Sequence, residues 1–300
     1  MLRPQNAWHV LVSLTFLFLL ILVYSGKDPP QNINRISRNS SVRNINRAQL
    51  NLYSLQDDAT MGKSRSETAD RHLPLVQDPV ICRYINNLTQ KINKRSDSPF
   101  SAHIRIINVS DISTAHSFPG GHYYIYRGLI HLIKSEDELA AVIGHEIGHI
   151  AARHETESLS LGLPMGESPF LSGADYEYEA DALGAQYARY CGYDPRGGIQ
   201  LLTRISKLPF INTGDGPKRT PDVSKRIANL HQALETVPSP WPASSDQSAF
   251  LEMKRRLNEL PAQSLNPDLP SFLDFNINTI PSPTKKKIRK RGQKYQRRHP

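Results

Sequence analysis

A short polar motif inside an apolar stretch constrains this chain most. His145-Glu146-Ile147-Gly148-His149 is flanked by residues with helical spacing of apolar side chains (Leu139, Val142, Ile143, Ile147 and Ile150). On an α-helix, positions four apart lie about 40° apart around the axis, so both imidazole rings can reach one point. Ser135 and Glu138 match a capping box. We therefore expect a largely buried helix from Ser135 to about His154 that presents two histidines and a glutamate at one site.

Two histidines at this spacing are typical of a Zn²⁺ site, because neutral imidazole is a preferred zinc ligand. A catalytic zinc site needs a third protein ligand and an open position for water. Glu146 follows the first histidine, so its carboxylate can take a proton from that water. The candidates for the third ligand are His154, His122, His131, His231 and the acids of segment 176–181.

The spacing of these candidates favours a glutamate. His154 comes five residues after His149, about 140° further around a continuous helix, and is expected to face away. Glu177 and Asp181 are four apart on a second predicted helix, 174–190, and share a face. We interpret Glu177 as the third ligand and Asp181 as the acceptor that orients a ligand histidine. Glu179 is expected to be a solvated surface acid.

Glycines within the motif helix predict a close neighbour. Gly144 and Gly148 are each about 1 kcal/mol less favourable in a helix than alanine. Their presence therefore suggests that another element approaches the helix backbone beside the site.

The remaining pattern predicts an α+β fold that is mainly helical. Asp78-Pro79 reads as a helix N-terminus, followed by an amphipathic segment to about Ile92. Segments 103–109 and 122–126 read as strands of a small antiparallel sheet, joined through Pro119-Gly120-Gly121. Later helices are expected from Asp194-Pro195, from Thr220-Pro221 to about Glu235, and over 248–260, the last after a linker at 237–248.

The two ends of the 300-residue chain differ from its middle. Residues 8–24 form an uncharged apolar run, which predicts a signal peptide or membrane anchor within 1–25. Residues 26–49 read as a disordered linker and 50–260 as the folded domain. The tail, 261–300, is expected to be disordered. Its last part, 284–300, holds nine Lys and Arg and no acid, so the rest balances at 28 against 28. This excludes a globally basic nucleic-acid-binding fold.

Cys82 and Cys191 are too few for a disulfide scaffold or a cysteine-rich zinc module, although one disulfide stays open.

Three segments resemble one family of enzymes. HEIGHIAARH (145–154), EYEADALGAQY (177–187) and CGYDPRGG (191–198) are similar to the zinc metallopeptidases of family M48, which include CAAX prenyl, HtpX-type, Oma-type and BepA-like proteases. The resemblance covers about residues 50–260. It implies a gluzincin-like domain with one Zn²⁺, held by His145, His149 and Glu177. It also implies Glu146 as catalytic acid and base and Asp181 as a supporting residue.

The resemblance implies an endopeptidase that acts on unfolded or misassembled envelope proteins, exported to the periplasm or anchored facing it. Strand 122–126 is expected to offer an edge to an extended peptide substrate. The alternative is a chaperone-like or latent metal-binding module. The basic tail at 284–300 suggests contact with anionic lipid or RNA. The sequence does not indicate an oligomeric state.

Overall fold

The computed structural model describes residues 51–110, 114–160, 173–208, 223–235 and 246–264. The chain divides into two units, 1–41 and 42–300, and all described residues belong to the second. None of the described helices is long and apolar enough to cross a bilayer, and residues 8–24 lie outside the described ranges. The proposed boundaries at 25, 49 and 260 remain predictions, as do the linker at 237–248 and the tail.

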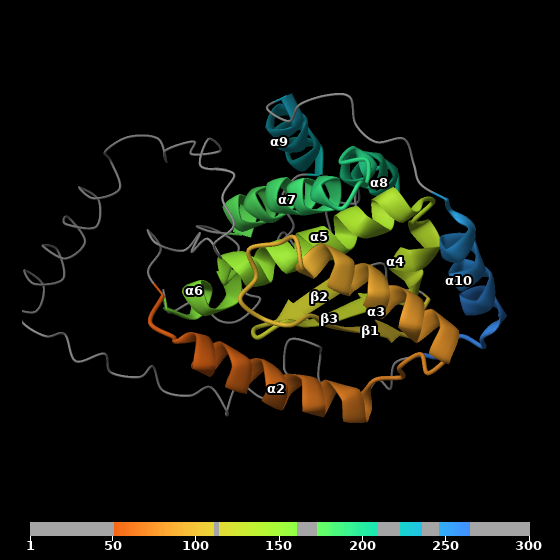
Figure 1. The fold of residues 1–300 in the computed structure, drawn as a ribbon, viewed down its shortest axis with the longest axis horizontal. Coiled ribbons are helices and arrows are strands. Elements are labelled where there is room, and N and C mark those ends of the chain that lie inside the picture. Colours follow the sequence, from red (N-terminus) through yellow and green to blue (C-terminus); the bar gives the residue numbers. More distant parts are fainter. Residues whose placement is uncertain (1–50, 111–113, 161–172, 209–222, 236–245, 265–300) are drawn as a thin grey trace, which may run out of the picture. The chain divides into compact units, whose positions relative to one another are not determined.

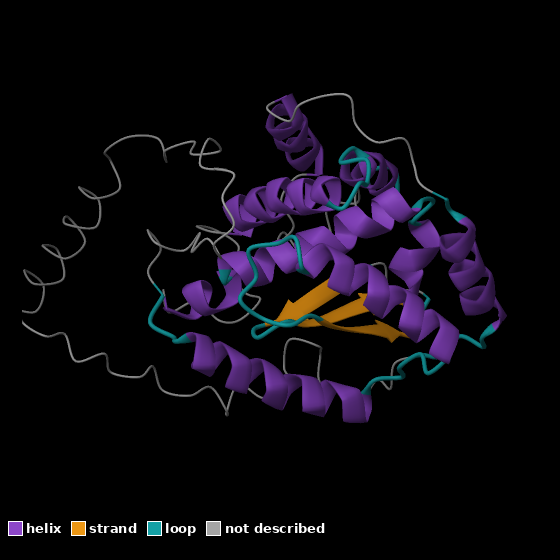
Figure 2. Ribbon diagram, in the orientation of Figure 1, coloured by secondary structure: helices purple, strands orange, loops and turns teal. Residues whose placement is uncertain are grey.

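A small mixed sheet lies among the helices (Figure 2). Its strands are β1 (His103–Ile107), β2 (Ala115–Phe118) and β3 (His122–Tyr126), in the order β1-β3-β2. β3 pairs parallel with β1 and antiparallel with β2. The expected purely antiparallel sheet was therefore wrong, and so was the expectation that 122–126 forms an edge. β3 is the central strand, which fits its nearly continuous burial.

The two faces of the sheet pack against different helices. Tyr123 and Ile125 of β3 belong to the main core with α3 (Pro79–Asn93) and α5 (Glu136–Ala152). Tyr124 and Tyr126 point to the other face, into a smaller cluster. This cluster includes Ala69 of α2 (Leu55–His72) and Leu73, the C-cap of that helix. This alternation follows from the period of two along a strand. In Figure 1, α2 and α5 accordingly lie on opposite sides of the sheet.

Helix α3 follows its sequence signals. Asp78 accepts hydrogen bonds from the backbone N–H groups of Val80 and Ile81, and Pro79 occupies the first turn. The predicted apolar face, which includes Ile81, Ile85, Leu88 and Ile92, is buried. Helix α2 was not predicted, because its buried residues include polar side chains such as Asp58 and Arg65 and give no clear apolar stripe.

Helix α5 begins as predicted but ends earlier. Ser135 caps the helix by accepting from the Glu138 N–H at 3.2 Å. The helix stops at Ala152, and Arg153 takes the left-handed conformation with φ 56° and ψ 36°. A new helix, α6 (His154–Ser160), follows at once. The change of direction at Arg153 moves His154 out of the continuous-helix position that the sequence suggested.

Helix α7 (Gly173–Tyr190) packs directly against α5, as the glycines predicted. A Cβ atom on Gly144 would lie 2.6 Å from the Gly184 carbonyl oxygen, and one on Gly184 would lie 2.5 Å from the His145 backbone nitrogen. Gly148 faces Ala180 in the same way. The two backbones therefore touch along the motif, and this contact fixes how far the donors of one helix lie from those of the other.

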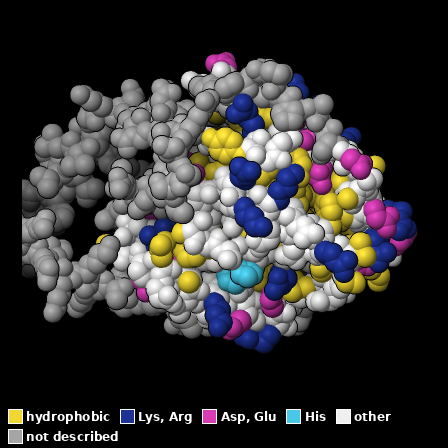
Figure 3. All heavy atoms as spheres, viewed as in Figure 1, with side chains coloured by type: hydrophobic (Ala, Val, Ile, Leu, Met, Phe, Trp, Pro, Cys, Tyr) yellow, Lys and Arg dark blue, Asp and Glu magenta, His cyan; other side chains and the backbone are white. Residues whose placement is uncertain are grey.

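The remaining helices complete the core: α4 (Arg127–Leu132), α8 (Gly197–Ile205), α9 (Val223–Glu235) and α10 (Ser248–Glu259). The helices expected after Pro195, up to Glu235 and over 248–260 are thus present, while Thr220-Pro221 lies outside the described ranges. Cys82 and Cys191 are free thiols, each donating to a backbone carbonyl. Figure 3 shows basic and acidic side chains interspersed on one face of this domain.

Candidate metal centre

Three side chains from two helices face one another. His145 and His149 come from α5 and Glu177 from α7, and one donor atom of each lies within 4.8 Å of the others. The two Nε2 atoms are 3.0 Å apart. Glu177 places Oε2 at 3.4 Å from Nε2 of His145 and Oε1 at 3.3 Å from Nε2 of His149.

These separations suit a tetrahedral zinc site. Zinc ligands lie about 2.0–2.1 Å from the ion, so two donors on a tetrahedron are about 3.3 Å apart. The donor set of two imidazoles and one carboxylate is also one that Zn²⁺ uses in catalytic sites. Both histidines direct Nε2 inward, while each Nδ1 has another partner. The residues present therefore fit the metal that the sequence suggested.

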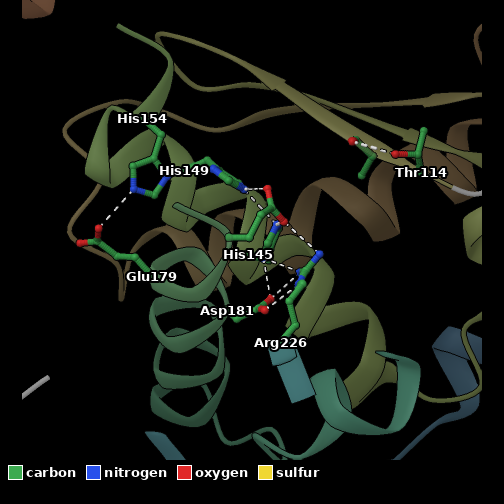
Figure 4. Close-up of polar contacts among 9 residues, drawn as sticks. Thr114, His145, His149, His154, Glu179, Asp181 and Arg226 are labelled. Atoms are coloured by element: carbon green, nitrogen blue, oxygen red, sulfur yellow. Dashed lines mark hydrogen bonds and ion pairs between the residues drawn. The ribbon is translucent and has the colours of Figure 1, made fainter. Parts of the chain in front are cut away.

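The first histidine is supported by two charged groups. Nδ1 of His145 lies 2.9 Å from Oδ1 of Asp181. Arg226 of α9 donates to both oxygens of Asp181, at 2.8 and 2.7 Å, and forms an ion pair with Glu177 at 2.9 Å. Figure 4 shows this guanidinium beside the Asp181 carboxylate. Arg226 therefore fixes the proposed ligand Glu177 and the proposed support Asp181 together.

The second histidine has a different partner. Nδ1 of His149 lies 2.9 Å from Nδ1 of His154, whose Nε2 is 3.3 Å from Oε2 of Glu179 (Figure 4). The expectation that His154 faces away was wrong, because the helix turns at Arg153. Glu179 is partly exposed and lies away from the three donors, as expected, but it contacts His154 rather than standing free. His122, His131 and His231 do not join the donor group.

Glu146 directly follows the donor residue His145 on α5 and is almost excluded from water. Glu146 is 7% exposed. Its negative charge acts on His116 of β2, Tyr123 of β3 and Arg226 of α9. Glu146 is therefore close enough to β2, β3 and α9 for its charge to act on a side chain of each.

The carboxylates around the site hold their charge despite burial. Burial raises the pKa of Glu177, but the neighbouring His149 and His145 outweigh this and hold the pKa well below its usual value. Burial also raises the pKa of Asp181, but hydrogen bonds from Arg226 and His145 outweigh burial. The pKa of Asp181 is therefore below its usual value. Burial lowers the pKa of His154 to about 4, so this imidazole is neutral at pH 7.

Sequence reasoning missed Arg226 and the position of His154. Arg226 lies 45 residues beyond Asp181 on another helix. The sequence around it indicates only a helix, from Thr220-Pro221 to about Glu235. The sequence predicts a continuous helix through His154, because no glycine or asparagine marks the left-handed turn at Arg153. On such a helix His154 would face away from the site.

Parts of this chain are similar in sequence to known proteins. Residues 81–168 match the model of Peptidase family M48. The Beta-barrel assembly-enhancing protease of Yersinia pestis is 25% identical over 259 residues, which cover 74% of this chain and 52% of that protein. The Mitochondrial metalloendopeptidase OMA1 of Schizosaccharomyces pombe is 28% identical over 229 residues, covering 63% and 64%. OMA1 of Arabidopsis thaliana is 30% identical over 145 residues, covering 41% and 30%.

Each of these matches spans less than two thirds of the relative's own length. The matched family segment contains the motif helix and His154, and it ends before Glu177. The family match over residues 81–168, the two kinds of metalloprotease relative and the facing histidine and glutamate donors together show that the chain is similar to peptidase family M48.

Proposed function

We propose that the chain is a zinc-dependent endopeptidase. One observation carries the proposal: the donor atoms of His145, His149 and Glu177 face one another at tetrahedral spacing, and the buried acid Glu146 directly follows His145 on the same helix. A purely structural metal site has no need of that acid. This favours hydrolysis over the alternative of a chaperone-like or latent metal-binding module.

In the proposed hydrolysis of a peptide bond, different residues of the chain bind the metal, transfer the proton and position the ligands. His145, His149 and Glu177 hold the ion, which, when bound, polarises the scissile carbonyl and lowers the pKa of the attacking water. Glu146 accepts the proton from that water and donates it to the nitrogen of the leaving amine. Asp181 and Arg226 keep His145 and Glu177 in position during both proton transfers.

An extended substrate is best placed along β2. This strand packs against α5 and carries His116, on which the charge of Glu146 acts. β3 lies on one side of β2, and no described strand pairs with the other side. A peptide added there would gain backbone hydrogen bonds with little demand on its sequence. We therefore place substrate binding at β2 instead of β3.

The substrate class follows from the relatives. One kind of relative is named for enhancing β-barrel assembly and the other for mitochondrial metalloendopeptidase activity. We propose that this chain acts on misfolded or misassembled envelope proteins. The apolar run at 8–24 supports export, as a signal peptide or as an anchor that faces the domain toward the periplasm. Contact of residues 284–300 with anionic lipid or RNA stays a prediction.

The decisive experiment compares Glu146→Gln with the wild type. Zinc content is measured by metal analysis, and cleavage of casein or another unfolded protein is followed by gel. We expect Glu146→Gln to keep one zinc per chain and its fold but to lose cleavage, because the proton acceptor is removed and no ligand is.

Glu136→Gln is the matched control. Glu136 is a similarly buried acid of the same helix, and its hydrogen bond from Tyr84 can be kept by an amide oxygen. Glu136→Gln should cleave like the wild type. A Glu146→Gln variant that still cleaves, or a wild type that binds no zinc, would contradict the proposed function.

A further inference from the structure

The turn at Arg153 brings a third histidine to the metal centre. Because α5 ends at Ala152 and Arg153 is left-handed, His154 at the start of α6 points back toward His149. The two Nδ1 atoms are 2.9 Å apart. His154 is 3% exposed, so water does not compete for this contact.

Other parts of the chain hold this turn. The Arg153 side chain donates to both oxygens of Asp58 on α2, at 2.6 and 2.9 Å, and to the Tyr53 carbonyl at 2.8 Å. A non-glycine residue in the left-handed region is unfavourable, typically by about 1–3 kcal/mol, unless its surroundings impose it. The bidentate ion pair with Asp58 is such a constraint. The position of His154 is thus fixed from a helix on the far side of the sheet from α7.

The plane of the His154 ring is fixed as well. The Tyr176 ring of α7 stacks on it, with centroids 4.3 Å apart and planes 13° from parallel. The same helix carries Glu179, whose Oε2 lies 3.3 Å from His154 Nε2. Both ring nitrogens of His154 therefore have a partner.

Proton placement along this chain has one consistent solution. If Nε2 of His149 binds the ion, its Nδ1 carries the hydrogen and donates to His154 Nδ1. A neutral imidazole that accepts at one nitrogen must donate at the other. His154 Nε2–H then donates to the Glu179 carboxylate.

We propose that His154 and Glu179 are positioning residues for the metal ligand His149: they fix its tautomer and ring orientation through the chain His149–His154–Glu179. The inference rests on the proposed metal site and adds a role for two residues that do not touch the ion. Histidine ligands commonly need such an acceptor, and its loss typically weakens metal binding about 10–100-fold.

The test measures the Zn²⁺ affinity of the full chain by competition with a chromophoric chelator, and records the visible spectrum of the Co²⁺-loaded form. His154→Leu should bind Zn²⁺ about 10–100-fold more weakly and shift the Co²⁺ bands. His154→Asn should recover most of the affinity, because its side-chain oxygen can accept from His149 Nδ1. Glu179→Gln, which keeps an acceptor oxygen, should stay closer to the wild type than Glu179→Ala.

Two further variants calibrate the scale. Asp181→Asn changes the acceptor of the other ligand histidine and gives a reference for losing such support. Asp175→Ala removes an exposed acid from the first turn of the same helix, α7, and should not change the affinity.

The outcomes separate the two proposals. Wild-type affinity in His154→Leu, or equal losses in the Leu and Asn variants, would overturn the positioning role and leave the proposed function intact. If His154→Leu does not fold by circular dichroism, the Glu179 pair decides, and equal affinities for Glu179→Ala and Glu179→Gln overturn the role. A wild type that binds no Zn²⁺ would overturn both proposals.

Discussion

The two histidines of the motif are held in different ways. On the α9 side, His145 contacts a carboxylate that Arg226 also binds, so its support is an arrangement of full charges. On the α6 side, His149 contacts the imidazole of His154, whose place depends on the backbone turn at Arg153. One proposed ligand is thus positioned by electrostatics between helices, and the other by the path of the chain.

The two sides also respond to pH in opposite directions. On the α9 side, Glu177 and Asp181 have lowered pKa values, so the stability they contribute is present above about pH 4 and lost as pH falls. On the α6 side, burial raises the pKa of Glu155 and of Glu157 to about 7. Those two carboxyls favour the folded state when protonated, so stability is lost there as pH rises.

Removing Arg226 should have the largest effect on stability. It would disrupt the α9 side of the site and leave the α6 side intact. Arg226→Leu leaves Glu177 and Asp181 close together without their cation. We expect the free energy of unfolding of the metal-free chain to fall by about 3–5 kcal/mol, as for breaking a buried ion pair. Saturating Zn²⁺ should reduce that loss, since the ion supplies positive charge at Glu177. Urea unfolding with and without Zn²⁺ measures both quantities.

Arg204→Leu provides the comparison for this variant. Arg204 binds the buried carboxylate of Glu138 on the same motif helix, at 2.7 and 2.8 Å, but outside the donor group. In Arg204→Leu, the fall in the free energy of unfolding should be similar with and without Zn²⁺. If Zn²⁺ relieves both variants equally, or neither, Arg226 has no special tie to the metal centre.

A substitution at Gly184 should affect both sides together. Gly184→Ala puts a methyl group 2.5 Å from the His145 backbone nitrogen and 2.8 Å from the Gly144 carbonyl carbon, so α5 and α7 must separate. We expect about 1–3 kcal/mol of destabilisation, as for overpacking, together with weaker Zn²⁺ binding. Thermal unfolding and chelator competition report the two effects.

Gly198→Ala on α8 is a suitable control, because its added Cβ meets the end of the flexible Leu230 side chain at 3.1 Å. It should be tolerated. A Gly184→Ala variant that is as stable and binds Zn²⁺ as tightly as Gly198→Ala would show that the helix contact does not set the donor spacing.

Neutralising Glu155 should have the smallest effect on the proposed metal centre and would sharpen the difference in pH response. Because the folded-state pKa is about 7 and the unfolded value about 4.5, the folded state binds more protons between these values. Stability should therefore decline from pH 5 to pH 8. Glu155→Gln, which resembles the protonated acid, should remove about 2.5 kcal/mol of that decline.

Chemical denaturation at pH 5, 6.5 and 8 tests this, with Glu67→Gln at an exposed position of α2 as the control. A steeper decline in Glu155→Gln than in the wild type would reverse the assigned direction. An unchanged slope would mean that Glu155 does not titrate in this range.

Local patterns were enough to predict the helices that carry the donors. The apolar spacing around His145 predicted α5, and the spacing of Glu177 and Asp181 placed both on one face of α7, as observed. The glycines predicted the contact between these helices, since a missing side chain has a direct packing reason. Such features depend on neighbours within a turn or two of helix.

Features that depend on distant parts of the chain were missed. Arg226 reaches the site from α9, and no local pattern indicates which helix will pack there. The left-handed turn at Arg153 depends on Asp58, almost a hundred residues earlier. The central place of β3 depends on strand order, and β2 has few β-branched residues to mark it as a strand.

The contact between Gly144 and Gly184 also determines when the proposed metal centre can form. Two donors come from α5 and one from α7, and they reach tetrahedral spacing when these backbones meet. A newly synthesised chain whose helices have not yet docked has two histidines but no Glu177 carboxylate beside them. The proposed hydrolytic centre is therefore completed by folding itself, so under this proposal the emerging polypeptide does not carry an assembled centre that could cut its own unfolded segments.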